Sequence, residues 1–194
     1  VLIDAHSDRQ DHVYLLFNRE TKKQTMLGER RPGIDPAQMA RMNVVNFTAR
    51  DGLKLTAYVT LPNTKVQRNL PMVVLPGELP WIRNGIWGWD AEVQFLASRG
   101  YAVIQPEPRG VPGFGVRHST AGNKQWGLAM QDDLADAVKW AVAEGIADPR
   151  RVCIAGSGYG GYAAMMGLIK TPELYRCGVN WSGITDIQAM FDRH

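Results

Sequence analysis

The chain has 194 residues, 45% of them hydrophobic and 21% charged, so it is long enough for one sizeable core and too apolar for a disordered protein. Its formal net charge is +3, with basic and acidic residues mixed along the chain. Without a long basic block, neither nucleic acid nor an anionic membrane surface is indicated as a partner. No apolar run approaches the roughly 18 residues of a membrane span, so we expect no membrane insertion.

The first 42 residues differ from the rest in their predicted secondary structure. Residues 12–18 and 19–27 read HVYLLFN and RETKKQTML, which predicts two short strands joined by a charged turn, as at the end of an all-β neighbour. Residues 28–42 contain prolines and a glycine that interrupt regular secondary structure, as in a connecting segment. Within it, Asp35 and Pro36 can cap and start a helix, which predicts a short helix through Met42. We therefore expect an all-β remnant at 1–27, a linker at 28–42 and a separate domain at 43–194.

From residue 43 onward, strands alternate with helices. Asp51-Gly52 predicts a tight turn in a hairpin over residues 44–62. Apolar runs predict buried strands at 71–76, 101–106, 151–156 and 176–183, with helices at 90–100, 125–145 and 160–170. This alternation predicts an α/β fold with a mostly parallel sheet. Cys153 and Cys177 both lie in apolar strand-like runs, where we expect buried free thiols.

One glycine-rich stretch carries the main functional signal. Residues 152–167 read VCIAGSGYGGYAAMMG, which predicts a strand turning sharply into a helix. In α/β hydrolases such a turn holds the nucleophile in the pattern G-x-S-x-G, but here the third position is Gly158 and Ser157 lies one place early. From spacing alone, this is an elbow without its nucleophile, an elbow shifted by one residue, or a turn with another purpose. Phosphate binding is a weak alternative, because the P-loop lysine and the dinucleotide glycine spacing are absent.

Three longer segments, residues 93–106, 125–156 and 159–186, resemble the catalytic domain of the prolyl oligopeptidase family of serine peptidases, especially its acylaminoacyl-peptidase-like bacterial branch. The resemblance begins near Asn43, and the leading residues resemble the last blade of the β-propeller that precedes this domain. It implies an α/β-hydrolase fold, incomplete at its C-terminus, that cleaves peptide bonds through an acyl-enzyme without metal or cofactor. The compartment stays open between bacterial cytoplasm and periplasm, since Val1 reads as the middle of a longer chain.

The resemblance assigns roles position by position. The family's elbow reads G-x-S-Y-G-G-Y, and every place matches except that of the nucleophile, which is Gly158. Ser157 falls on the variable position and is the alternative nucleophile. Tyr159 would supply one oxyanion N–H group and Leu79 a possible second. The loop holding Leu79 is itself altered, because it reads Gly-Glu-Leu-Pro where the family usually has His-Gly-Gly-Pro.

The remaining candidates are weaker. Arg109 survives from a loop that the family places beside the cleft and is predicted to contact substrate, with His118 as a second candidate. His6 and His12 are interpreted as surface residues rather than ligands. Asp192 and His194 lie too close together to be the family's acid and base, so we expect both groups to be absent from this chain and interpret the two residues as a solvated tail.

Two side-chain groups favour a structural interpretation. The carboxylates on the 125–145 helix are interpreted as a solvated face rather than a metal cluster, namely Asp132, Asp133 and Asp136. Tryptophans near residue 85 could line a substrate pocket, but packing is favoured for Trp87 and Trp89.

Two functions follow from these observations. The first is a serine peptidase by family, inactive in this chain because Gly158 replaces the nucleophile. The alternative is a non-catalytic relative that binds peptide or a protein partner in the same cleft. We also expect the 176–183 strand to be an exposed apolar edge that favours self-association.

Overall fold

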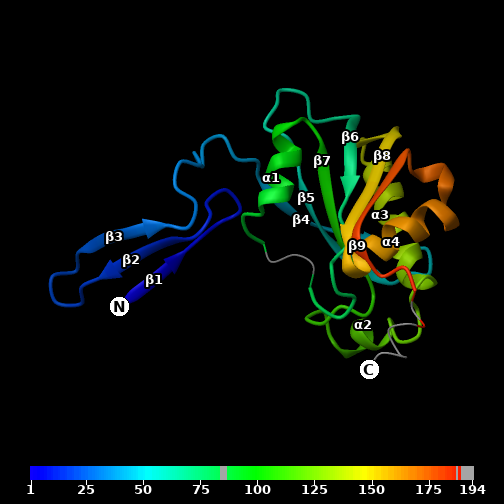
Figure 1. Cartoon of the computed structure of the whole chain (residues 1–194), viewed down its shortest axis with the longest axis horizontal. Coiled ribbons are helices and arrows are strands. Elements are labelled where there is room, and N and C mark those ends of the chain that lie inside the picture. The colour runs from blue at the N-terminus through cyan, green and yellow to red at the C-terminus, as the bar shows by residue number, and fades with distance from the viewer. Residues whose placement is uncertain (84–86, 187, 189–194) are drawn as a thin grey trace.

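A computed structural model of the chain describes residues 1–83, 87–186 and 188. It contains a three-stranded sheet near the N-terminus and a six-stranded sheet flanked by helices, with the small sheet projecting from one side of the larger body (Figure 1). Among the described residues, no helix has the length and apolar character needed to cross a membrane.

The small sheet is an antiparallel meander of β1 (Leu2–Ala5), β2 (Val13–Phe17) and β3 (Gln24–Glu29). The sequence predicted the last two strands, and the structure adds β1 in front of them. The apolar residues of this meander are largely half-exposed or exposed, as expected for a sheet with little core of its own.

The helix predicted over residues 35–42 is wrong. The structure has turns up to residue 39, and Met42 is the first residue of strand β4. The Asp35 carboxylate accepts the Ala37 N–H at 2.9 Å, which closes a local turn instead of starting a helix. Met42 pairs with Thr60 in the sheet, and a residue in this strand pairing cannot also be the last residue of a helix.

The large sheet has the order β4-β5-β7-β6-β8-β9. Its first two strands form the predicted antiparallel hairpin, and β6, β7, β8 and β9 pair in parallel. The strands are β4 (Met42–Thr48), β5 (Lys54–Thr60), β6 (Leu70–Val74), β7 (Ala102–Glu107), β8 (Ala147–Ser157) and β9 (Cys177–Gly183). Together with the flanking helices, this arrangement confirms the predicted α/β-hydrolase fold.

Helices cover both faces of the sheet, and alternate side chains on each strand face opposite layers. The face toward α1 (Ala91–Ser98) carries Val73, Val103 and Ala155. The opposite face carries the larger core, including Met72, Ile104 and Ile154, under helices α3 (Ala129–Ala143) and α4 (Gly158–Lys170). Two short helices, α2 (Val116–Thr120) and η1 (Pro172–Leu174), lie in the connections.

Strand β9 is the last strand of the large sheet among the residues that the structure describes. Val179 and Trp181 on this strand remain 49% and 40% exposed, so an apolar edge is present as expected. Self-association through this edge stays a prediction.

The two cysteines form a disulfide bond, so the expectation of buried free thiols is wrong. Cys153 on β8 and Cys177 on β9 are direct partners in the parallel register, with their Cα atoms 4.8 Å apart. This separation lies within the range that a disulfide requires. The sequence did not indicate the bond, because the pairing depends on the register of two strands that are 24 residues apart in the chain.

Reduction of this disulfide should destabilise the fold without unfolding it. Because the bond closes a loop of 24 residues, we expect thiol reductant to lower the free energy of unfolding by about 2–4 kcal/mol. Urea denaturation with and without reductant measures the difference. The Cys153→Ser/Cys177→Ser variant is the control and should not respond to reductant; a wild-type midpoint equally indifferent to reductant would contradict the bond.

Candidate active site

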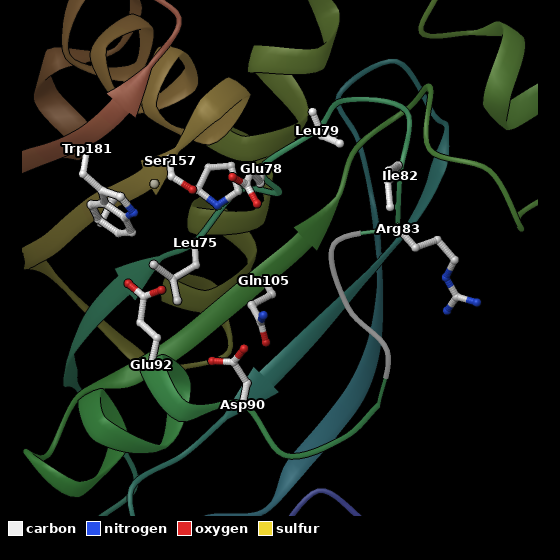
Figure 2. A pocket seen from close by; sticks show the side chains of 13 residues that line it. Leu75, Glu78, Leu79, Ile82, Arg83, Asp90, Glu92, Gln105, Ser157 and Trp181 are labelled. Atoms are coloured by element: carbon white, nitrogen blue, oxygen red, sulfur yellow. The ribbon is translucent and has the colours of Figure 1, made fainter. Parts of the chain in front are cut away.

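A cavity of about 380 Å³ lies where β6, β7 and β8 end, on the face of the sheet toward α1 (Figure 2). Leu75, Gln105 and Ser157 reach it from these three strands or the residue that follows, and Trp181 reaches it from β9. Ligands of parallel α/β sheets bind at this edge, because the loops that follow the strands meet there. We therefore take this cavity as the candidate active site.

The turn from β8 into α4 is made by Gly158. It has φ of +54°, a conformation that disfavours residues with a Cβ atom. Ser157 precedes it in extended conformation and caps the helix, although its hydroxyl makes no capping hydrogen bond. The structure thus forms the sharp strand-to-helix turn predicted from the glycine-rich stretch.

The backbone of Glu78 occupies the space where a side chain at position 158 would lie. A Cβ atom on Gly158 would be only 2.6 Å from the Glu78 carbonyl oxygen and 3.0 Å from its Cγ. The same carbonyl oxygen accepts the Tyr159 backbone N–H at 2.8 Å. The N–H group expected to stabilise an oxyanion is therefore already bonded within the protein.

Ser157 at this turn and Leu79 in the loop after β6, the other two residues with assigned roles, both border the cavity. Ser157 projects its hydroxyl toward the cavity, and Leu79 lies at its rim with a side chain 39% exposed (Figure 2). The described residues that line the cavity include no histidine, so this part of the chain places no imidazole beside the Ser157 hydroxyl to act as the base that a serine nucleophile needs.

The cavity is acidic, which the sequence did not reveal beyond Glu78. Asp90 and Glu92, at the start of α1, line it together with Glu78. Desolvation, with a contribution from the Asp90 charge, raises the pKa of Glu92. Arg83 also lines the cavity but donates a hydrogen bond to the Tyr58 hydroxyl. The sequence shows two carboxylates at the start of this helix, but only the packing of α1 on the sheet shows that they face the cavity.

Arg109, predicted to contact substrate, lies outside the residues that line this cavity. Arg109 is 7% exposed, and its guanidinium donates hydrogen bonds to Asp133 at 2.8 and 2.9 Å and to Asp51 at 2.6 Å. These hydrogen bonds raise the pKa of Arg109, so the guanidinium stays charged. The structure therefore uses Arg109 to tie the loop after β7 to α3 and to the β4–β5 turn.

The predicted solvated face of carboxylates on α3 is wrong for two of its three members. Asp133 is fully buried against Arg109, and Asp136 is largely buried against Arg50, whose guanidinium lies 2.8 Å away. Asp132 is half-buried and pairs with Arg50 and Lys170. Helical spacing alone could not show that Asp133 and Asp136 are buried, because the arginines that pair with them come from distant loops.

His118 also lies away from the cavity. It is 5% exposed on α2, with its Nδ1 atom 3.0 Å from the Val111 carbonyl oxygen, and it borders a separate surface pocket beside Lys54 and Thr56. Asp192 and His194, interpreted as a solvated tail, lie outside the described residues.

The tryptophans take different positions. The Trp87 indole N–H donates to the Met42 carbonyl oxygen at 3.1 Å, and Trp89 lies against Arg31, with the guanidinium carbon 4.8 Å from the ring centre. Trp81 stacks on Trp126 with ring centres 5.9 Å apart. None of the three lines the candidate site.

The mixed sheet, the helices on both faces and the strand-to-helix turn at its carboxyl edge define an α/β hydrolase. A model of the prolyl oligopeptidase family matches residues 87–194. The chain therefore belongs to the prolyl oligopeptidase family, as its sequence motifs predicted.

Similar proteins support this assignment. Dipeptidyl aminopeptidase BIII of Pseudoxanthomonas mexicana is 36% identical over 92% of this chain, and dipeptidyl peptidase family member 6 of Caenorhabditis elegans is 31% identical over 94%. The solved structure of a puromycin hydrolase matches 98% of the chain with a TM-score of 0.84 and 25% identity. The chain spans 27% of each curated relative and 30% of the puromycin hydrolase chain.

Substitution of Gly158 should be costly for a steric reason beyond its backbone conformation. We expect Gly158→Ala to destabilise the fold by about 1–2 kcal/mol through φ strain, and by a further 1–3 kcal/mol or so through the clash with Glu78. Gly145→Ala is the matched control, because Gly145 has φ of +70° with no atom near its Cβ position. Urea denaturation should give a clearly smaller loss for the control; equal losses would contradict the clash.

A loosened loop should reduce that cost. In a Glu78→Gly background, the loop gains freedom to move away, so the additional loss caused by Gly158→Ala should shrink. Additive effects of the two substitutions, measured in a double-mutant cycle, would show that neither the Glu78 side chain nor the stiffness of its loop adds to the cost at position 158.

Loss of Arg109 should be damaging because it leaves Asp133 charged and buried. We expect Arg109→Met to lower the free energy of unfolding by about 3–5 kcal/mol. The double variant Arg109→Met/Asp133→Asn should recover part of this loss. It removes the unpaired charge but keeps a side-chain oxygen at position 133 that can accept the backbone N–H of residue 109. Urea denaturation measures both variants, and a double variant no more stable than Arg109→Met would contradict this explanation.

Proposed function

We propose that this part of the protein forms the peptide-binding cleft of a prolyl oligopeptidase-family protein in which acyl transfer is blocked. The observation that carries the proposal is the position of Glu78. Its carbonyl oxygen bonds the Tyr159 N–H and fills the space beside Gly158. The Glu78 carbonyl oxygen thus occupies the space that a nucleophile side chain at position 158 would need. It also uses the Tyr159 N–H that would otherwise donate to an oxyanion.

The electrostatics of the cavity support the same conclusion. Catalysis of acyl transfer needs hydrogen-bond donors aimed at the oxygen that becomes negative in the transition state. Here the Glu78 carboxylate lines the cavity together with Asp90 and Glu92. Negative charge at this position opposes the formation of an oxyanion.

These features suit binding of a cationic peptide segment. A cavity of about 380 Å³ holds a few side chains of a ligand. Leu75 and Trp181 offer apolar surface, while Asp90 and Glu92 can bind the amino terminus of a peptide or a basic side chain. The dipeptidyl aminopeptidase among the relatives bears a name that refers to a peptide amino end, which agrees with this choice of ligand.

Two assays test the proposal together. The purified protein should neither hydrolyse activated esters and aminoacyl amides nor be labelled by a fluorophosphonate, since loss of a nucleophile commonly costs about six orders of magnitude in turnover. Labelling of Ser157, located by mass spectrometry and abolished by Ser157→Ala, would overturn the proposal and support the shifted elbow.

Binding is tested by fluorescence anisotropy with a labelled short peptide that has a free amino terminus. We expect Glu92→Gln to weaken binding roughly tenfold, and N-acetylation of the peptide to do the same. Glu144→Gln is the matched control, because Glu144 is exposed just after α3, before the start of β8. Equal binding of the free and acetylated peptides would contradict the role of the carboxylates.

The same assay has a pH dependence. Because the pKa of Glu92 is raised, this carboxylate loses its charge at a higher pH than an ordinary glutamate as the solution is acidified. Binding of the cationic peptide should therefore weaken early on acidification in the wild type, and this early phase should be missing in Glu92→Gln.

A further inference from the structure

The hairpin of β1 and β2 brings three metal-ligating side chains together. Ala5 pairs with Val13 as the last pair of the two strands, and His6 and His12 are the residues that directly follow and precede this pair. Asp4 lies two residues before His6 and therefore on the same face, diagonal to His12. The register thus gathers Asp4, His6 and His12 at one end of the hairpin.

The distances show that the three side chains meet. The His12 Nδ1 atom is 2.7 Å from the Asp4 Oδ1 atom, and the two imidazole rings are centred 4.6 Å apart. One ligand atom from each residue lies within 4.8 Å of the others. The Asp4 and His12 side chains are 47% and 30% exposed, so an ion can reach them from solvent.

We propose that Asp4, His6 and His12 bind a divalent transition-metal ion of the Zn²⁺ class. Two imidazoles and one carboxylate are a ligand set that Zn²⁺ prefers, with bonds of about 2 Å and a fourth position open to water. Tetrahedral geometry places such ligand atoms about 3.3 Å apart. The present ligand atoms lie within 4.8 Å of one another, so the proposed ion requires the side chains to rotate toward it.

A simple ion pair does not account for the cluster. The contact between His12 and Asp4 satisfies these two residues and gives no reason for a second imidazole beside them. A metal ion accounts for all three side chains, because it takes one ligand atom from each ring and one from the carboxylate, whose negative charge partly balances that of the ion.

The position of the cluster gives the ion a structural effect. His6 and His12 flank the loop of residues 7–11, which docks on the large domain. The Asp8 carboxylate accepts the Met42 N–H at 3.0 Å, and the Gln94 side-chain amide donates to the Asp8 carbonyl oxygen at 3.1 Å. An ion that joins the two ends of this loop would hold it in the docked conformation.

The open position of the ion would face a second cavity. This cavity, of about 450 Å³, is lined by His6 and His12 on one side and by Trp89 and Asp90 on the other. It lies between the hairpin and the six-stranded sheet. Solvent in this cavity can supply the remaining ligand.

The test is a Zn²⁺ titration of the purified, chelator-treated protein by isothermal calorimetry. We expect one high-affinity ion per protein, a thermal midpoint that rises with Zn²⁺, and the intense visible bands of tetrahedral Co²⁺ after cobalt substitution. His6→Ala, His12→Ala and Asp4→Asn should each weaken binding at least about tenfold. Glu20→Gln, in the exposed turn between β2 and β3, is the matched control and should bind like wild type.

Two results would overturn the proposal. The first is the absence of saturable Zn²⁺ binding by the wild-type protein. The second is binding that persists unchanged in His6→Ala and His12→Ala, which would place the ion elsewhere. Circular dichroism checks that each variant is folded. If one is not, imidazole proton NMR of the wild type at fixed pH decides: added Zn²⁺ should shift the signals of His6 and His12 together, and unchanged signals would overturn the proposal.

Discussion

The contact between the Glu78 backbone and the β8–α4 turn governs the carboxyl edge of the sheet. Its hydrogen bond to the Tyr159 N–H fixes the loop after β6 against the start of α4. Only glycine at position 158 leaves room for that approach, since any Cβ atom would meet the same carbonyl oxygen. Gly158 and the altered loop around Glu78 therefore form one structural unit, and the chemistry of the cleft depends on both.

A second constraint keeps the neighbouring loops in place. Arg109 is enclosed by Asp133 and Asp51, so a residue that the family resemblance pointed to as a substrate contact serves to join three elements. Buried ion pairs hold their geometry strictly, because separation of the partners would leave a charge without solvent. The cleft is thus built on a rigid base, while the carboxylates at the start of α1 give it its charge.

The N-terminal hairpin follows a similar logic on a smaller scale. It has too little apolar surface for a core of its own, and its loop is held on the large domain by hydrogen bonds to Asp8. Strand register then decides which polar side chains meet. It places Cys153 opposite Cys177 in the large sheet, and the last pair of β1 and β2, Ala5 and Val13, brings the adjacent His6 and His12 side by side.

The sequence by itself determined the family, the alternation of strands and helices, and the glycine turn, because these features are local patterns of apolar spacing and backbone freedom. Only the tertiary structure decided the features that depend on distant residues. Four features depend on contacts between segments that lie far apart in the sequence, so local patterns could not predict them. They are the disulfide, the burial of Asp133, the acidic lining of the cavity and the hydrogen bond that occupies the Tyr159 N–H. The failed helix at 35–42 has the same cause, since pairing of β4 with β5 outweighed a local preference at Asp35 and Pro36.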